Sequence, residues 1–510
     1  MQLDKTKNTL RNAFWGFFNQ IIQNLLPFFT RTLLIKLLGE QYLGLSSLFT
    51  SILQILNLAE AGFSQAIVFS MYKPIADDDD EKICALLSLY RFIYKIVGTV
   101  ITVAGLCLLP FLPRFINGTY PSDVNIYILY CIYLSNIVLN YFLFAYKQSL
   151  FSAFQREDKI SKVASVLSIA QPIIQISLLF AYRNLIAYTV AIPLITITKN
   201  ITIAILAKKQ FPQYVCKGKI SKDAAKSIYK KVAGLFIEKL SATSRDSFDS
   251  IFISSFIGLA SVTIYSNYFY IMNAIYGFFR IFIGGMNAGI GNAVASQPVE
   301  DNYKTFKTLS FLYSLIAGWC TICLFCLYQP FITLWLGDRF LFSFKEMTAM
   351  CAYFYVQTLI NIKGSYTAAC GLWWENRIRA IVEAGANIVL NYAFVRLFGI
   401  FGIIIATVLT IVFINFGYGS AILFKNYFKD KKKLFLFFLT HVFYFFVTAL
   451  IALVTFHTAN LLINKYGLIS FCIRVGLCIA IPLPLYYFAY RKQFHNESIK
   501  RLLLKIIKRR

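Results

Sequence analysis

The chain has 510 residues and a formal net charge of +27, and 58% of its residues are hydrophobic while only 14% are charged. Soluble domains are about one quarter charged and nearly half apolar, so this composition excludes an ordinary globular protein, a disordered regulator and a secreted disulfide scaffold. Together with a mean hydropathy of +0.63, the composition predicts a polytopic membrane protein.

Along the chain, about fourteen apolar segments are long enough to cross a bilayer, which takes about 20 predominantly apolar residues in a helix. These segments are residues 13–38, 42–70, 84–109, 123–150, 160–182, 184–207, 232–257, 260–290, 305–329, 340–362, 376–397, 400–424, 434–457 and 466–490. The first of them is too long for a signal-peptide core and lacks a small-residue cleavage site, so we expect it to remain as a helix.

The basic residues are distributed unevenly between the two sides of these segments. Most Lys and Arg residues lie in the connections on the N-terminal side. By the positive-inside rule that side is cytoplasmic, which places both termini in the cytoplasm. The positive charge is therefore explained by membrane topology, and nucleic acid is not expected as a partner.

A weak internal repeat relates the two halves of the chain. Two pairs of segments match in the same order: LLGEQYLGLSSLF (37–49) with SFIGLASVTIYSNYF (255–269), and KQSLFSAFQREDKI (147–160) with KGSYTAACGLWWENRI (363–378). The first pair aligns Gly39 with Gly258. Parallel repeats are a known transporter design in which the substrate binds between the halves. The predicted fold class is therefore all-α, with two six-helix bundles around a central cavity and two additional C-terminal helices.

This organisation predicts five parts of the chain. They are an N-terminal six-helix bundle (1–207), a basic cytoplasmic linker (208–231), a second six-helix bundle (232–425), two additional transmembrane helices (426–490) and a basic amphipathic tail (491–510). The tail alternates apolar and basic residues at helical spacing, which is typical of a helix on an anionic membrane surface. We expect anionic lipids to contact the linker and the tail, with a protein partner as the alternative.

Charged residues inside the predicted spans are the main functional signal, because an ionised side chain at the bilayer centre costs about 2.5 kcal/mol or more. The basic residues are Arg31, Lys239, Arg245, Arg280 and Arg474, and the acidic residues are Glu60, Glu238, Asp246, Asp249 and Glu383. Each is expected to face an opposite charge or a water-filled cavity.

Polar stripes at helical spacing accompany several of these charges. On the first, second and eighth segments they contain Gln20, Asn24, Arg31, Asn57, Glu60, Asn273 and Arg280. Such a stripe predicts a helix that lines an aqueous cleft. The alternative is a set of hydrogen bonds between helices that only hold the bundle together.

The chemistry of these side chains favours an anionic ligand. The guanidinium groups of Arg31, Arg245 and Arg280 present donors that match the oxygens of phosphate or pyrophosphate. The carboxylates of Asp246, Asp249 and Glu383 are candidates to hold a proton or Na⁺ whose release drives a conformational change. The alternative is that the acids and bases simply neutralise one another.

Enzymatic activity is not predicted. The 3 His residues are dispersed, no P-loop is present, and the outer connections are short. Cys320, Cys323 and Cys326 recur every three residues, but no His or carboxylate lies near them, so we expect no metal site. No cofactor is expected apart from Na⁺ or H⁺ as a coupling ion. Nothing in the chain is similar to a channel selectivity filter.

The stretch ILNLAEAGFSQAIVFSMYKPIADDDDEKI (55–83), followed by LSLYRFIY (87–94), resembles Wzx-type polysaccharide repeat-unit flippases. The opening KNTLRNAFWGFF (7–18) and the arrangement of spans extend this resemblance over the whole chain. These flippases belong to the multidrug/oligosaccharidyl-lipid/polysaccharide (MOP) exporter superfamily. The resemblance implies a MATE-like fold in the cytoplasmic membrane of a bacterium.

The same resemblance implies a function. Such flippases move undecaprenyl-pyrophosphate-linked oligosaccharide units to the outer leaflet by alternating access, for capsule, O-antigen or exopolysaccharide synthesis. A polysaccharide polymerase and chain-length machinery would then be partners. The alternatives are a cation-coupled multidrug exporter of the superfamily and, less favoured, a flippase for lipid II or a teichoic acid precursor.

Residue roles follow from the resemblance by position. Arg31 and Arg280 are implied to hold the pyrophosphate, with Arg245 and Lys239 next. The lipid II branch implies a Na⁺ site on the seventh, eleventh and twelfth helices, where the matching residues are Asp246 or Asp249, Asn387 and Thr407. Glu383 departs from the arrangement of acids in that branch, so the choice between Na⁺, H⁺ and no coupling ion stays open.

Overall fold

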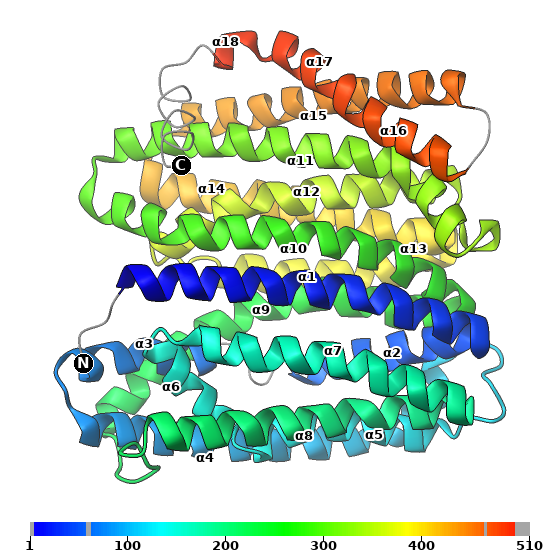
Figure 1. The fold of residues 1–510 in the computed structure, drawn as a ribbon. Coiled ribbons are helices and arrows are strands. Elements are labelled where there is room, and N and C mark those ends of the chain that lie inside the picture. The colour runs from blue at the N-terminus through cyan, green and yellow to red at the C-terminus, as the bar shows by residue number, and fades with distance from the viewer. Residues whose placement is uncertain (1–4, 58–62, 464–466, 495–510) are drawn as a thin grey trace. The chain divides into compact units, whose positions relative to one another are not determined.

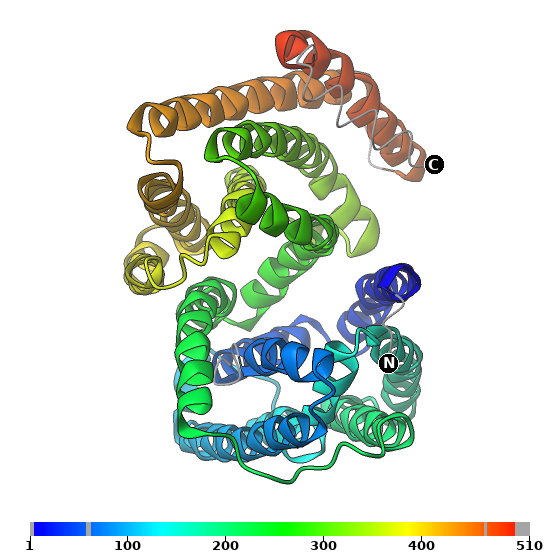
Figure 2. The same cartoon turned by 90° about the vertical axis from the view of Figure 1, so that its left-hand side faces the viewer.

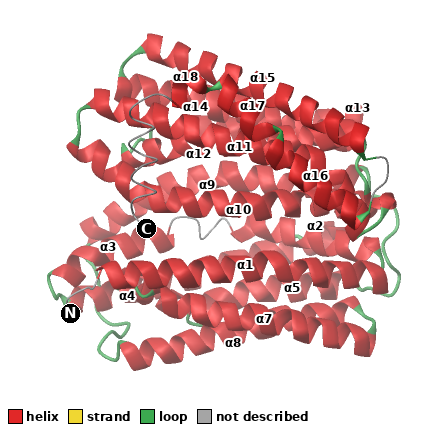
Figure 3. Cartoon of the chain, turned by 45° about the horizontal axis from the view of Figure 1, so that its top comes forward, coloured by secondary structure: helices red, strands yellow, loops and turns green. Residues whose placement is uncertain are grey.

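The structure is a computed structural model that describes residues 5–57, 63–463 and 467–494 (Figure 1). Every regular element in these ranges is a helix, which confirms the predicted all-α fold class (Figure 3). Seven described helices are long and apolar enough to cross a membrane, or eight if one bent pair counts as a single span. The chain is therefore a multi-pass membrane protein.

The chain forms two compact units, Met1–Ser266 and Asn267–Arg510, and the division falls within α10. The helices of the first unit are α1 (Lys5–Leu37), α2 (Glu40–Leu56), α3 (Phe63–Ala76), α4 (Asp80–Cys107), η2 (Leu109–Phe115), α5 (Ile126–Phe142), η3 (Ala145–Lys147), α6 (Gln148–Ala153), α7 (Glu157–Tyr182), α8 (Leu185–Gln210), α9 (Lys222–Phe256) and the start of α10 (Leu259–Ser296). Within this unit α1 packs along α7, and the two lie side by side in both views (Figures 1 and 2).

The core of the first unit follows from apolar residues at helical spacing. On α2, Leu45, Leu48, Phe49 and Ile52 recur three or four residues apart and are all buried. This helix packs against α9, while α5 packs against α4 and α8. The polar residues of α9 are thereby brought into the interior of the unit.

The second unit is built around α11. Its further helices are α11 (Val299–Trp335), η4 (Asp338–Phe340), α12 (Phe344–Ala369), α13 (Arg377–Leu409), η5 (Thr410–Tyr418), α14 (Gly419–Leu423), η6 (Phe424–Phe428), α15 (Lys431–Leu462), α16 (Leu468–Ala480), α17 (Pro482–Ala489) and α18 (Arg491–Phe494). Helix α11 contacts α12, α15 and α16. At Gly318 the absence of a side chain admits the hydroxyls of Thr448 and Tyr486, which lie 3.0 Å apart.

Helix boundaries recur in the two halves of the chain, as the weak sequence repeat suggests. Helices α2 and α10 each begin directly after a glycine with positive φ, Gly39 at 121° and Gly258 at 129°. A side chain at either position would be strained, because this region is open mainly to glycine. Gly118 and Gly337 also have positive φ and are separated by the same number of residues as the first pair. The aligned glycines therefore mark equivalent turns.

A sharp turn divides the longest helical stretch, Arg377–Phe428. Gly399 has φ 61° and ψ −137°, which is not helical. A methyl group built on Gly402 would collide with the carbonyl oxygen of Phe394, eight residues earlier. Because eight residues of a continuous helix rise about 12 Å, this contact requires the chain to turn sharply at Gly399. The turn lies between the spans predicted at 376–397 and 400–424.

Candidate functional site

Arg31 is held where α1 meets the beginning of α10. Its side chain is half-buried, and Nη2 donates a hydrogen bond of 2.7 Å to the Ser266 hydroxyl. That hydroxyl in turn donates to the carbonyl of Thr263, whose own hydroxyl donates to the carbonyl of Glu40 at 2.6 Å. Arg31, which is predicted to bind an anion, is therefore oriented by a chain of hydrogen bonds between neutral groups of α10 and α2.

Helix α9 carries the charged residues predicted at 239–249. Arg245 is buried, and its Nη1 donates to the Ser241 hydroxyl at 3.5 Å. Asp249 is fully buried and accepts a 2.8 Å hydrogen bond from the hydroxyl of Tyr265. Asp246 is half-buried and Lys239 is exposed. One helix thus presents both signs of charge, some in the interior and some at the surface of the unit.

Arg280, in the second unit, is exposed and lies over the ring of Tyr276, 5.5 Å from its centroid. The Tyr276 hydroxyl donates to Asn361 Oδ1 at 2.9 Å, which fixes the ring beneath the guanidinium. Arg280 forms no ion pair with any residue that the structure describes. Asn273, on the same helix, is half-buried. The ring of Tyr276 therefore supports the guanidinium of Arg280, which stays exposed.

Three of the amides predicted to line a cavity make hydrogen bonds within the first unit. Gln20 donates to Asn24 at 3.0 Å, one turn further along α1. Asn57 accepts a 2.5 Å hydrogen bond from the hydroxyl of Tyr141 on α5. The Tyr141–Asn57 bond joins α5 to the end of α2, as expected if the polar stripes hold the bundle together, whereas the Gln20–Asn24 bond stays within α1. Glu60 lies outside the described residues.

Glu383 belongs to a buried network in the second unit. Arg379 Nη1 lies 2.5 Å from Glu383 Oε2, and the two side chains are 1% and 0% exposed. The amide of Asn415 donates to both carboxylate oxygens of Glu383, at 3.0 and 2.9 Å. Lys363 donates to Asn415 Oδ1 at 2.9 Å and to its carbonyl at 3.0 Å. Helices α12, α13 and η5 are thus joined through one carboxylate and two cations.

Both oxygens of Glu383 accept hydrogen bonds, so a coupling cation at this carboxylate would share it with Arg379 and Asn415. One turn further along α13, Asn387 donates to the hydroxyl of Thr407 at 3.0 Å. Among the described residues, no group of three or more His, Cys, Asp or Glu side chains is arranged to hold a metal ion. The coupling roles of Asp246, Asp249, Glu383, Asn387 and Thr407 stay a prediction.

Three cations are absent from the set of charged residues that the sequence places within spans: Lys199, Lys363 and Arg379. The structure places Lys199 within α8, and it buries Lys363 and Arg379 almost completely. Arg379 precedes Glu383 by four residues, the spacing of ion pairs on one helix face, and this was an available signal. Lys199 lies well inside an apolar segment, where a lone charge is a signal in itself.

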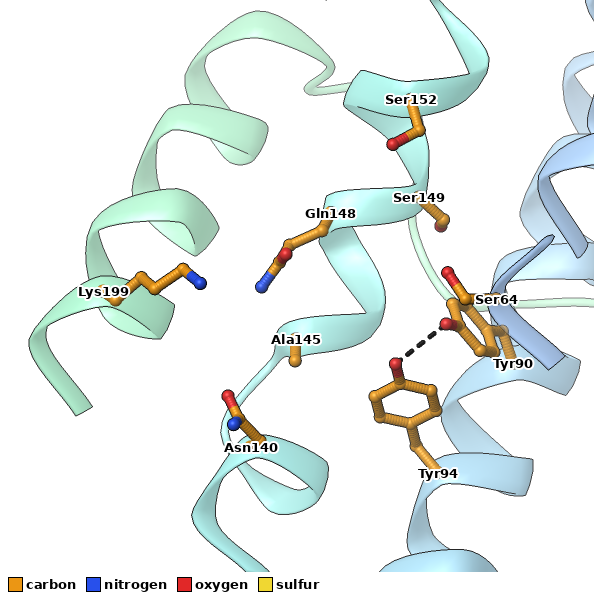
Figure 4. Close-up of a pocket in the computed structure, with 9 residues that line it drawn as sticks. All are labelled: Ser64, Tyr90, Tyr94, Asn140, Ala145, Gln148, Ser149, Ser152 and Lys199. Atoms are coloured by element: carbon orange, nitrogen blue, oxygen red, sulfur yellow. Dashed lines mark hydrogen bonds between the residues drawn. The ribbon is translucent and has the colours of Figure 1, made fainter. Parts of the chain in front are cut away.

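A polar pocket of about 250 Å³ lies within the first unit (Figure 4). Its lining residues are Ser64, Tyr90, Tyr94, Asn140, Ala145, Gln148, Ser149, Ser152 and Lys199. They come from α3, α4, α5, η3, α6 and α8. Among the lining residues that the structure describes, Lys199 is the charged one, and none is a carboxylate.

Comparisons with known proteins agree with this architecture. The family model described as polysaccharide biosynthesis protein matches residues 9–285. No curated protein matches the chain significantly in sequence. The lipid II flippase MurJ, in an inward closed conformation, is similar to the chain with a TM-score of 0.69 at 15% identity, covering 95% of this chain and 99% of MurJ.

Two further structures share the fold. An inward-facing multidrug resistance MATE transporter of the MOP superfamily has a TM-score of 0.62 at 16% identity, covering 79% of this chain and 94% of its own. A MOP superfamily transporter from Pyrococcus furiosus has a TM-score of 0.57 at 15% identity, covering 82% and 95%. The fold is thus that of MurJ and the MATE transporters, and because the family model matches more than half of its length, the chain belongs to the polysaccharide biosynthesis protein family.

Proposed function

We propose that this protein is a flippase that moves undecaprenyl-pyrophosphate-linked oligosaccharide units from the cytoplasmic to the outer leaflet, for capsule, O-antigen or exopolysaccharide synthesis. The match of residues 9–285 to the polysaccharide biosynthesis family carries this proposal. The fold supports it, because MurJ is described as a lipid II flippase. A sugar chain and a pyrophosphate cannot cross about 30 Å of hydrocarbon without a polar path.

The basic residues supply the proposed contacts to the pyrophosphate. Arg280 has an exposed guanidinium whose planar fork of donors suits phosphate oxygens. Arg31, oriented by Ser266, is the second proposed contact, with Arg245 and Lys239 as further candidates. Because these side chains bind the charged group rather than the sugar, the same contacts serve units of different composition.

Transport would proceed by alternating access, coupled to Na⁺ or H⁺ through Asp246 or Asp249. We place the protein in the bacterial cytoplasmic membrane with both termini in the cytoplasm, where the basic linker and tail meet anionic lipids. Its product would pass to a polysaccharide polymerase with its chain-length machinery.

A cation-coupled multidrug exporter is the alternative, favoured by the MATE-like fold. The basic residues on the spans argue against it, because they repel a cationic substrate. A flippase for lipid II or a teichoic acid precursor would use the same pyrophosphate contacts and differs only in the attached group.

Depletion of the protein distinguishes these functions. The pool of lipid-linked oligosaccharide is measured in depleted cells, and its sidedness is read with a membrane-impermeant reagent that modifies sugars. Complete units should accumulate on the cytoplasmic face. An unchanged pool with normal surface polysaccharide and new sensitivity to cationic drugs would instead identify an exporter.

A further inference from the structure

The pocket of Figure 4 lies at the bend between two helices, Ile126–Phe142 and Ala145–Ala153, that together are long and apolar enough to cross a membrane. Helix α5 ends at Phe142, Phe144 adopts a left-handed conformation with φ 60°, and α6 continues at an angle of 51°. Irregular backbone at membrane depth is tolerated where it is buried in protein or lines a watery cavity. Ala145, Gln148 and Ser149, at and just after the break, line the pocket. The break therefore has a polar cavity beside it.

Lys199 brings a positive charge into this cavity. It lies 11 residues before the end of α8 at Gln210, which corresponds to roughly 16 Å along the helix. It forms no hydrogen bond or ion pair with any described residue. A charge at this depth requires a counter-charge or water.

The amide groups beside Lys199 are arranged as donors. Asn200, which is 1% exposed, donates to Asn140 Oδ1 at 2.9 Å and accepts from Gln148 Nε2 at 3.4 Å. Asn140 has its acceptor engaged in this way, and its amide nitrogen makes no hydrogen bond within the described chain. Figure 4 shows the amino group of Lys199 and the amide nitrogen of Gln148 facing each other across the pocket. One N–H of Gln148 donates to Asn200, so its second N–H and the amino group of Lys199 can both donate to an acceptor placed between them.

We propose that this pocket binds one small oxyanionic group, a phosphate or a carboxylate, between Lys199 and the amide nitrogens of Gln148 and Asn140. The hydroxyls of Ser64 and Ser152 are further donors in the lining. A volume of about 250 Å³ is below the 300 to 1,000 Å³ of sites for drug-sized ligands, so the pocket takes a single group and not an oligosaccharide. The anion comes either from solution or from the head group of an acidic lipid.

The test is a binding measurement on the full-length purified protein. The unfolding temperature is recorded in neutral phosphatidylcholine nanodiscs while inorganic phosphate or acetate is added, and again in nanodiscs that contain phosphatidylglycerol without added anion. A ligand that binds only the folded state raises this temperature with its concentration. Stabilisation in the first arm identifies a free anion, and stabilisation only in the second identifies a lipid head group.

Lys199→Met should weaken the response at least about tenfold, because a charge-assisted hydrogen bond is lost. Lys199→Arg should retain most of it. The matched control is Lys95→Met, which removes the same charge from an exposed position on α4, outside the basic linker, and should respond as the wild type does.

Three outcomes would overturn the proposal. The first is no stabilisation in either arm, and the second is an equal response of Lys199→Met and the wild type. The third concerns Glu60, the carboxylate nearest in sequence to Ser64. If Glu60→Gln and Lys199→Met each destabilise the protein and the double variant recovers, the lysine has a partner within the chain. Since no transport is measured, the result is independent of the proposed flippase function.

Discussion

Arg379 and Glu383 form an ion pair in which both side chains are almost completely withdrawn from solvent, at 1% and 0% exposure. They lie one turn apart on α13, with Asn415 completing the coordination of the carboxylate. Breaking a buried pair is more costly than breaking an exposed one, because the remaining charge keeps its desolvation cost. The pair therefore offers a direct test of this network.

Arg379→Met should lower the free energy of unfolding by about 3 to 5 kcal/mol, since Glu383 would stay buried without its guanidinium partner. The measurement is denaturant unfolding in detergent. Arg377→Met is the matched control, because Arg377 stacks over Trp374 at 4.1 Å and is only half-buried. Equal losses in the two variants would show that the ion pair contributes nothing particular.

Gly419→Ala should destabilise the same network by about 1 to 3 kcal/mol through overpacking. The added Cβ would lie 2.6 Å from Lys363 Nζ and 3.0 Å from Arg379 Cδ, which is too close for both. Gly385→Ala is the control, because a Cβ there meets nothing within 4 Å. That substitution should be neutral or stabilise α13 by up to about 1 kcal/mol, as alanine favours helix. A loss confined to Gly385→Ala would contradict the packing described.

Arg31→Ala and Arg280→Ala should each abolish export of the lipid-linked oligosaccharide while membrane insertion stays normal. The proposed cause is loss of donors for the pyrophosphate. Arg31→Lys should restore only part of the activity, because an ammonium cannot reproduce the guanidinium fork. Arg114→Ala, at an exposed residue of η2, serves as the control. Wild-type export by both alanine variants would remove these residues from the site.

Asp430 caps α15 and should give the protein a small acid-sensitive contribution to stability. The backbone N–H of Lys433 donates to Asp430 Oδ1 at 3.0 Å and lowers the pKa of this carboxyl from its ordinary value of 3.8. A lowered pKa means that the contribution is complete above that ordinary value and is lost as the pH falls through the folded-state pKa.

The measurement is the unfolding temperature as a function of pH for the wild type and Asp430→Asn. Asparagine also caps helices but does not titrate, so the difference between the two proteins should shrink below about pH 4. A difference that stays constant across this range would exclude a role for the charge.

Much of the fold could be predicted from the sequence because hydropathy and helical spacing act over long segments. The turn at Gly399 falls between two predicted spans, and the alignment of Gly39 with Gly258 identifies two glycines that share a backbone conformation. Both signals can be identified in short segments of the sequence. The packing of α1 against α7 cannot be predicted in this way, because residues far apart in the sequence determine it.

The candidate sites were less accessible to sequence reasoning. Glu383 and Asn387 were predicted from the sequence as candidate residues, and both are buried. Their partners were missed, because Lys363 and Arg379 lie near the predicted ends of spans, where a basic residue is ordinarily cytoplasmic. Lys199 was missed because strongly apolar neighbours dominate the average hydropathy of its segment. Asn415 carries no charge and lies on a π-helix, whose side-chain spacing an α-helical pattern does not describe.

The break between α5 and α6 has a consequence for the surrounding lipid. Helix α5 has 17 residues and rises about 25 Å, which is less than the roughly 30 Å thickness of a typical hydrocarbon core. The exposed side chain of Phe144 therefore comes closer to the acyl chains when the bilayer thickens, while Ala145 and Tyr146 beside it stay buried in the protein. Hydrophobic mismatch of this kind makes the first unit sensitive to membrane thickness, so lipid chain length becomes a variable that acts on the pocket from outside.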